Sequence, residues 1–135
     1  MDAQRKTRGR HSIRLPGLDY SLAGVYFITA PTFQRMPLLG LEGSGIIRLS
    51  EIGEIVRACW CEIPQHYPHV VLDAYVPMPD HLHGLLLIVW ARHGVPKQEA
   101  YGKPIAGSVP TIVRSFKAAS TSRVRKEIGL PKSRI

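Results

Sequence analysis

Three stretches of the chain have apolar residues in the pattern of β-strands. AGVYFITA (23–30) is rich in β-branched and aromatic residues and predicts a strand. VVLDAYVP (70–77) and HLHGLLLIVW (81–90) predict two more strands, and the Pro-Asp pair at 79–80 predicts a tight turn between them. Two strands joined by a tight turn form an antiparallel hairpin. IIRL (46–49) is either a short additional strand or an extended lead-in to the segment that follows.

Two other stretches have apolar residues at helical spacing. The first helix is predicted from Ser50, a suitable N-cap, to Pro64, which ends it. Its apolar face comprises Ile52, Ile55, Val56, Cys59, Trp60 and Ile63. The second helix is predicted from Ser108 and is stopped by Gly129 and Pro131. Its apolar stripe comprises Ile112, Val113, Phe116, Ala119 and Val124.

The order of these elements predicts an α+β fold, with a ferredoxin-like antiparallel sheet and helices packed against it. The glycine- and proline-rich stretches 31–45 and 91–107 are predicted to be loops. The 135 residues suffice for one domain, which we expect over residues 15–135, after a flexible basic arm at 1–14. The longest apolar run is far shorter than the roughly 20 residues that span a bilayer, and no signal peptide is visible. We therefore expect a cytoplasmic protein without a membrane partner.

Positive charge is concentrated at the two ends of the chain. The formal net charge is +8, with five basic residues and one acidic residue in 1–14, and seven basic and one acidic in 107–135. The intervening residues carry six basic and eight acidic side chains. This distribution favours a polyanionic partner such as nucleic acid, although solvated tails at both ends would have the same composition.

The segment MPDHLHGLLLIV (78–89) places two histidines at the start of an apolar strand. Side chains alternate along a strand, so His81 and His83 face the same side, about 6–7 Å apart, while Leu82 faces the core. Two imidazoles at that spacing can share a metal ion. Alternatively, they are ordinary histidines at a strand end with satisfied hydrogen bonds.

Four segments together resemble one family. VVLDAYVPMPDHLHGLLLIV (70–89) is similar to the signature of the HUH single-tyrosine transposases, especially the REP-associated tyrosine transposases. IRLPGLDYSLAGVYFITAPTFQRMPLLG (13–40) resembles the family's opening strand and the loop that follows it, although Leu39 stands where phenylalanine is usual. LSEIGEIVRACWCEIPQHYPHV (49–70) and GSVPTIVRSFKAASTSRV (107–124) resemble its two helices.

The resemblance implies an endonuclease of DNA transposition and recombination. His81 and His83 would bind Mg²⁺ or Mn²⁺, which would polarise the scissile phosphate of single-stranded or hairpin DNA. A tyrosine would then attack the phosphorus, forming a 5′-phosphotyrosine and freeing a 3′-hydroxyl. The resemblance also makes DNA contacts the preferred interpretation of several basic residues: Arg5, Lys6, Arg8, Arg10 and Arg14 in the arm, and Arg114, Lys117 and Arg123 in the second helix.

The nucleophilic tyrosine of that family has no counterpart in this sequence. In the family it follows the second helix, whereas this sequence ends at LPKSRI (130–135). Tyr101 is the only tyrosine after the histidine strand and is a weak substitute. We therefore expect a chain truncated before the tyrosine segment, one that retains metal and DNA contacts and lacks the covalent step.

Two other functions stay open. The chain could be a catalytically inactive DNA-binding remnant of a transposase. It could also be a metal-dependent hydrolase that uses the two histidines and a water nucleophile, with Asp73 or Asp80 as the nearby carboxylates. Cys59 and Cys61 are two apart on a helix and diverge, so they are not expected to share a zinc ion.

Overall fold

The computed structural model describes residues 23–89 and 107–129 of the chain. Its elements follow in this order: β1 (Gly24–Pro31), the 3₁₀ helix η1 (Phe33–Arg35), β2 (Gly40–Gly43), β3 (Ile46–Leu49), α1 (Glu51–Cys61), α2 (Ile63–His66), β4 (Val70–Met78), β5 (His81–Ile88) and α3 (Val109–Ile128). The predicted loop at 91–107, apart from Gly107, lies outside the described residues, as do the basic arm, Tyr20, Tyr101 and Pro131.

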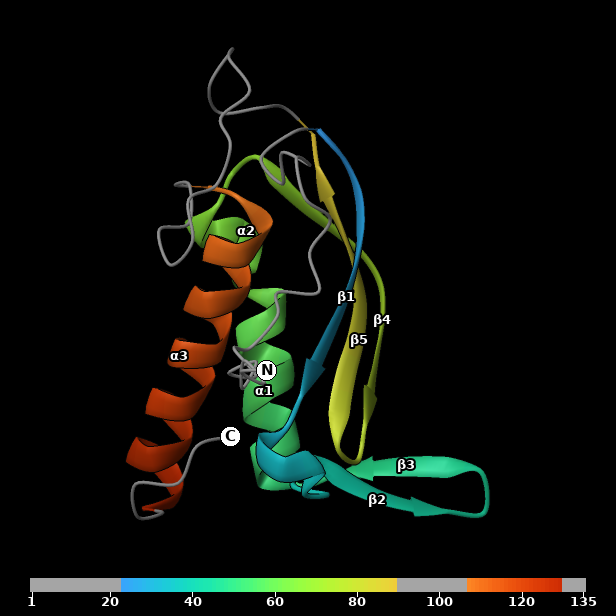
Figure 1. Ribbon diagram of the computed structural model, residues 1–135. Helices are drawn as coiled ribbons and strands as arrows, with labels where there is room; N and C mark the ends of the chain where they lie inside the picture. Colours follow the sequence, from blue (N-terminus) through green and yellow to red (C-terminus); the bar gives the residue numbers. More distant parts are fainter. Residues whose placement is uncertain (1–22, 90–106, 130–135) are drawn as a thin grey trace, which may run out of the picture.

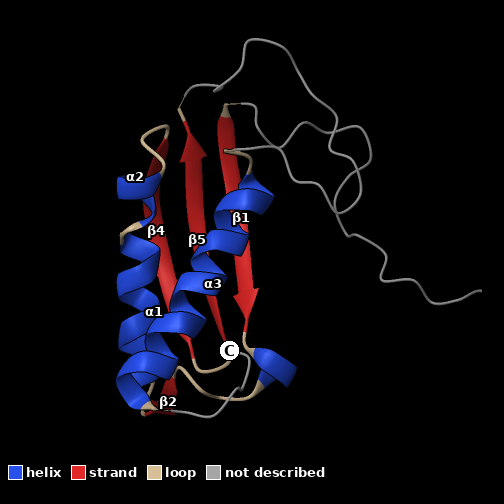
Figure 2. Ribbon diagram, turned by 90° about the vertical axis from the view of Figure 1, so that its left-hand side faces the viewer, coloured by secondary structure: helices blue, strands red, loops and turns tan. Residues whose placement is uncertain are grey.

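The main sheet has the strand order β1-β5-β4, and β5 is antiparallel to both neighbours. Strands β1 and β4 are therefore parallel to each other, with β5 inserted between them, which is the split arrangement of ferredoxin-like folds. Helices α1 and α3 cover one face of this sheet (Figures 1 and 2). The predicted α+β class, with an antiparallel sheet and packed helices, is confirmed.

The opposite face of the sheet, which we call the open face, has no described helix over it. A separate two-stranded hairpin, β2–β3, projects beyond this face at the end where β4 turns into β5 (Figures 1 and 2). Two backbone hydrogen bonds hold that end together: Thr32 N–H donates to the Asp80 carbonyl and Leu39 N–H donates to the Pro79 carbonyl, both at 2.9 Å. The start of β5 therefore lies at a corner between the open face and the hairpin.

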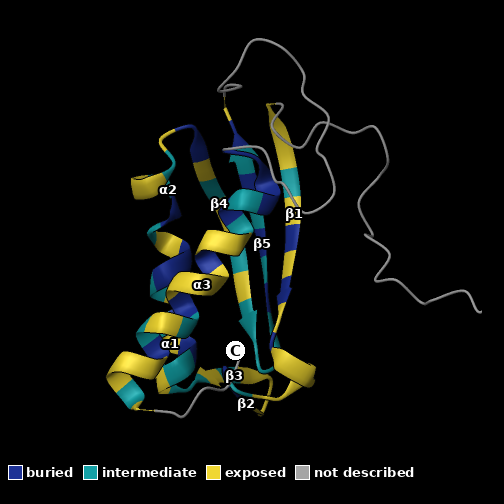
Figure 3. Ribbon diagram, turned by 60° about the vertical axis from the view of Figure 1, so that its left-hand side comes forward, coloured by how far each residue is buried: buried dark blue, intermediate teal, exposed yellow. Residues whose placement is uncertain are grey.

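The hydrophobic core lies between the sheet and the helices, where burial is greatest (Figure 3). Trp60 of α1 is fully buried, and its ring meets Phe116 of α3 edge-on with centroids 5.4 Å apart. The ring also lies directly on Gly84 of β5, where an added Cβ would come within 2.3 Å of Trp60 Cζ2. Gly84 therefore has no side chain because the Trp60 ring occupies that space.

The start of α1 and the end of α3 lie where the sequence predicts. The Ser50 hydroxyl accepts a hydrogen bond from Gly53 N–H at 3.0 Å, which caps α1. Gly129 takes a left-handed conformation (φ 71°) after α3, as a C-terminal glycine often does. None of the described helices combines the length and apolar character needed to cross a membrane.

Three details of the prediction were wrong. Residues 31–45 are not all loop, since Gly40–Gly43 forms β2 and pairs with the Ile46–Leu49 strand. Pro64 does not end the first helix, which already stops at Cys61, but occupies the first turn of α2, where its missing N–H costs nothing. Ala119 is exposed rather than part of the apolar stripe of α3.

Candidate functional site

His81 and His83 both lie on the open face at the start of β5. The intervening Leu82 is fully buried under the helices, as the alternation of the strand predicts. The antiparallel pairing places Pro31 and Met78 beside His81, and Thr29 and Val76 beside His83. Only the central strand of a three-stranded sheet has neighbours on both sides, so the backbone beneath the histidines is held firmly.

The orientation of His81 is set by the residue before it. His81 Nδ1 lies 2.5 Å from Asp80 Oδ1. This hydrogen bond from His81 lowers the pKa of the Asp80 carboxyl below its usual value. An ionised carboxylate can only accept, so Nδ1 carries the proton and the lone pair of the neutral imidazole resides on Nε2. A histidine held in this way is prepared to bind a metal ion through Nε2.

The second histidine is held by strand β1. His83 Nδ1 lies 3.0 Å from the Thr29 hydroxyl. The ring of Phe27 stacks on the His83 ring, with centroids 5.1 Å apart and 26° between the planes. The two histidine rings are themselves 4.2 Å apart and nearly perpendicular, closer than the 6–7 Å expected from strand geometry. Both Nδ1 atoms are therefore occupied, and both Nε2 atoms have no hydrogen bond to any described residue.

Within residues 23–89 and 107–129, the site supplies two ligands for a metal ion, the imidazoles of His81 and His83. Among the described residues, no group of three or more His, Cys, Asp and Glu side chains is arranged to hold a metal ion. The remaining ligands would have to be water, a phosphate oxygen or residues outside the described ranges. Imidazole nitrogen is a more suitable ligand for Mn²⁺ than for Mg²⁺.

Sequence reasoning missed Arg35, which lies at the same corner. Its guanidinium is 3.9 Å from Asp80 Oδ2 and largely exposed. Gln34 and Arg35 both have positive φ angles, 52° and 57°, which are uncommon for residues with side chains. Such strained backbone is often found at functional sites. The only sequence signal was an arginine between two prolines, which does not reveal that η1 lies beside β5.

The predicted DNA-contacting residues of the second helix lie on the other side of the sheet. Arg114 and Lys117 are exposed on α3, in the helical layer. Arg123 instead binds the Glu62 carboxylate through both terminal nitrogens, at 3.2 and 2.7 Å. The described residues include eight basic and seven acidic side chains, so most of the excess positive charge lies outside them.

None of the described tyrosines lies on the histidine face. Tyr26 and Tyr75 are partly buried against the core, and their strand partners, Leu86 and Gly84, face the helices. The Tyr67 hydroxyl is hydrogen-bonded to the Ser115 hydroxyl at 2.7 Å, between α2 and α3. Tyr101, the weak substitute for the nucleophile, falls outside the described residues.

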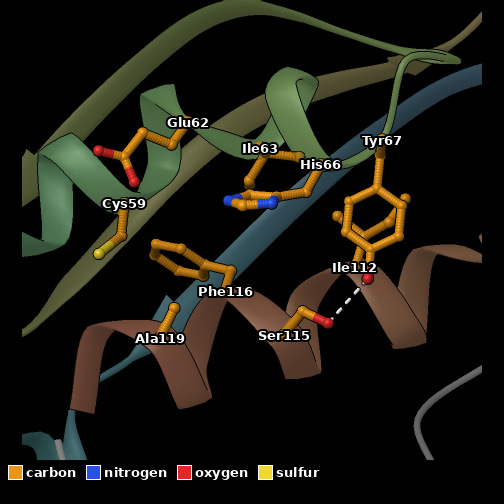
Figure 4. A pocket seen from close by; sticks show the side chains of 9 residues that line it. All are labelled: Cys59, Glu62, Ile63, His66, Tyr67, Ile112, Ser115, Phe116 and Ala119. Atoms are coloured by element: carbon orange, nitrogen blue, oxygen red, sulfur yellow. Dashed lines mark hydrogen bonds between the residues drawn. The ribbon is translucent and has the colours of Figure 1, made fainter. Parts of the chain in front are cut away.

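A separate cavity of about 320 Å³ lies between α1–α2 and α3 (Figure 4). Its walls are mainly apolar, and Cys59, whose thiol pKa is raised by burial, lies at one side. The polar groups at its two ends are already engaged: Glu62 with Arg123, and Tyr67 with Ser115. The cavity is on the far side of the sheet from His81 and His83, and neither of these two residues lines it.

Comparisons with known proteins relate this chain to a sequence relative and to solved structures. No protein-family model matches the chain. An uncharacterized protein of Haemophilus influenzae is 36% identical over 124 residues, which cover 87% of this chain and 69% of that protein. The chain belongs to the family of this Haemophilus protein.

The fold of this Haemophilus family is also seen in a crystal structure. A "putative transposase" from Deinococcus radiodurans matches with a TM-score of 0.52 and 20% sequence identity. The match covers 86% of this chain and 70% of the Deinococcus chain. The present chain therefore shares the fold of this Deinococcus protein.

Proposed function

We propose that this protein binds single-stranded or hairpin DNA and acts in DNA transposition through a divalent-metal site at His81 and His83. The observation that carries the proposal is the pair of imidazoles on the open face of a transposase-like fold, with both Nδ1 atoms engaged and both Nε2 atoms available. The family proposed is the HUH single-tyrosine transposases, which the PDHLH segment resembles.

Each residue of the corner has a role in this proposal. His81 and His83 hold Mg²⁺ or Mn²⁺, which when bound supplies Lewis-acid activation of a scissile phosphate. Asp80 fixes the ring orientation and tautomer of His81, and Thr29 fixes the ring orientation of His83. Arg35, exposed beside Asp80, contacts a phosphate oxygen of the bound strand.

Whether the protein cleaves DNA or only binds it depends on whether a tyrosine can reach the phosphate. Because no described tyrosine lies on the open face, the nucleophile would have to be a tyrosine outside the described residues, such as Tyr101 or Tyr20, with its hydroxyl within about 3–3.5 Å of the phosphate. If no tyrosine reaches the phosphate, the protein binds DNA without the covalent step. The hydrolase interpretation is less favoured, since Asp80 Oδ1 already binds His81 Nδ1.

The test is a cleavage and binding assay on end-labelled, hairpin-containing single-stranded DNA with Mn²⁺. Products are separated under denaturing conditions that retain protein–DNA adducts. The wild-type chain is compared with His81→Ala, His83→Ala and Tyr101→Phe, and with His66→Ala as a matched control. His66 is an exposed histidine of α2 on the helical side.

A covalent adduct that is lost in both site-histidine variants and retained in His66→Ala supports a working nuclease, and its loss in Tyr101→Phe identifies the nucleophile. Metal-dependent binding without an adduct supports DNA binding without the covalent step. Binding and cleavage that are unchanged by loss of His81 and His83 would contradict the proposal, as would failure of the wild-type chain to bind this DNA.

A further inference from the structure

The open face continues from the histidines as a strip of exposed apolar side chains. Strands β1 and β5 pair Phe27 with Leu85, and Val25 with Leu87. Phe27 is 67% exposed and Val25 64% exposed, both on the edge strand β1, so two large apolar side chains face solvent side by side with the histidines. None of these four residues is charged, although the exposed Asp73 lies in the irregular part of β4 between the partners of Leu86 and Gly84.

We infer that Phe27 is a stacking platform for the base next to the phosphate held at His81 and His83. This inference rests on the proposed function and adds to it a contact with the base rather than with the phosphate. The ring of Phe27 is already aligned with His83, at 26° between planes, and the greater part of the residue is open to solvent. A ring fixed in this way offers a flat apolar surface at little cost in conformational entropy.

The chemistry of the strip favours bases over phosphates. Single-stranded nucleic acid is commonly bound by a charged track for the backbone together with aromatic side chains for the bases. Here Arg35 and the two histidines lie at the corner, and the apolar pair Phe27–Leu85 follows directly along β1 and β5. A nucleotide with its phosphate at the corner therefore directs its base along the strip. Stacking of this kind discriminates poorly between bases, because every base has a π-face.

The experiment separates base contacts from phosphate contacts. Binding is measured by fluorescence anisotropy with Mn²⁺, using a labelled thymine oligonucleotide of about 12 nucleotides and an oligonucleotide of equal length without bases. Wild-type protein is compared with Phe27→Ala and Phe27→Tyr. Val25→Ala is the matched control, because Val25 lies on the same strand, faces the same side and is equally exposed, one row farther from the histidines.

We expect Phe27→Ala to weaken binding of the thymine oligonucleotide roughly tenfold, within the range that loss of one base–aromatic stack produces. Binding of the oligonucleotide without bases should not change. Phe27→Tyr, which keeps the ring, should bind both like wild type, and Val25→Ala should lose less than about twofold.

Equal losses on both oligonucleotides, or no loss on either, would overturn the stacking role while leaving the proposed function intact. Failure of the wild-type chain to bind either oligonucleotide while it binds the hairpin-containing DNA would also overturn the stacking role. Failure on all three substrates would overturn the proposed function itself. Sedimentation velocity covers the remaining alternative. If the wild type is a dimer that Phe27→Ala converts to a monomer, the strip is an interface between two copies, and the inference is wrong.

Discussion

The two faces of the β1-β5-β4 sheet are built from alternating residues of the same strands, yet they have opposite properties. On the covered face Leu82, Gly84 and Leu86 of β5 are buried beneath α1 and α3. On the open face the alternating residues His81, His83, Leu85 and Leu87 remain partly accessible. One face therefore serves stability, and the other is available for chemistry.

Because of this difference, substitutions on the covered face should change stability, whereas substitutions on the open face should change function. Residues of the covered face contribute to stability through close packing, so a missing or extra methyl group there lowers the free energy of unfolding. Residues of the open face hold one another by hydrogen bonds and stacking at the surface, so their removal costs little folding free energy. Under the proposed function, changes on the open face should instead weaken binding of metal and DNA.

The largest effect is expected from Trp60→Ala. Loss of this fully buried ring should lower the free energy of unfolding by about 3–5 kcal/mol. Phe27→Ala, on the open face, should cost below about 1 kcal/mol because most of that ring is already solvated. Urea unfolding followed by far-ultraviolet circular dichroism measures both. A comparable loss in the two variants would show that something covers the open face in solution.

Gly84→Ala should destabilise the protein by about 1–3 kcal/mol, since its new methyl group would collide with Trp60. The double variant Gly84→Ala with Trp60→Phe tests this cause, because the smaller ring makes room. Its loss should be clearly smaller than the sum of the two single losses. Strict additivity in the same unfolding assay would show that the two positions do not compete for space.

Asp80→Ala should weaken Mn²⁺ binding about 10- to 100-fold by freeing the His81 ring, with little change in stability. This prediction rests on the proposed metal site. Asp73→Ala removes the same charge from an exposed position of β4 and is the matched control. Isothermal titration with Mn²⁺ compares the two. An equal effect of both variants would mean that only net charge matters and that Asp80 has no orienting role.

The smallest effect is expected at the Glu62–Arg123 pair, on the helical side. The hydrogen bonds from Arg123 lower the pKa of the Glu62 carboxyl in the folded protein. Because the pKa of this carboxyl is lower in the folded protein, the ion pair stabilises the fold at pH values above the unfolded pKa of about 4.3. This stabilisation is lost as the pH falls through the folded pKa. Glu62→Gln should therefore be slightly less stable than wild type at neutral pH, and the difference should shrink below about pH 4. A difference that is constant from pH 7 to about pH 3 would argue against this linkage.

Much of the fold could be predicted because it depends on local patterns. The strands β1, β4 and β5 and the helices α1 and α3 each have their own periodicity, and Ser50 and Gly129 mark helix ends by local geometry. Strand β2 could not be predicted, because GLEG has weak strand propensity and is held by its pairing with Ile46–Leu49. The end of the first helix was wrongly placed at Pro64 because a proline fits the first turn of a helix as well as the position after its end.

The candidate site also has features that the sequence predicts and features that depend on the tertiary structure. The sequence by itself determined that His81 and His83 share one side of a strand with Leu82 on the other, since side chains alternate with a period of two. The hydrogen bond between Asp80 and His81 was not predicted, because adjacency in the chain does not fix which way the Asp80 side chain points at the turn. Only the tertiary structure decided that Thr29 and His83, 54 residues apart, would be hydrogen-bonded, that Phe27 would stack on the same ring, and that Arg35 would lie beside Asp80. These contacts depend on the register between β1 and β5 and on the packing of η1 at the corner, which follow from burial of the whole core and from no single segment.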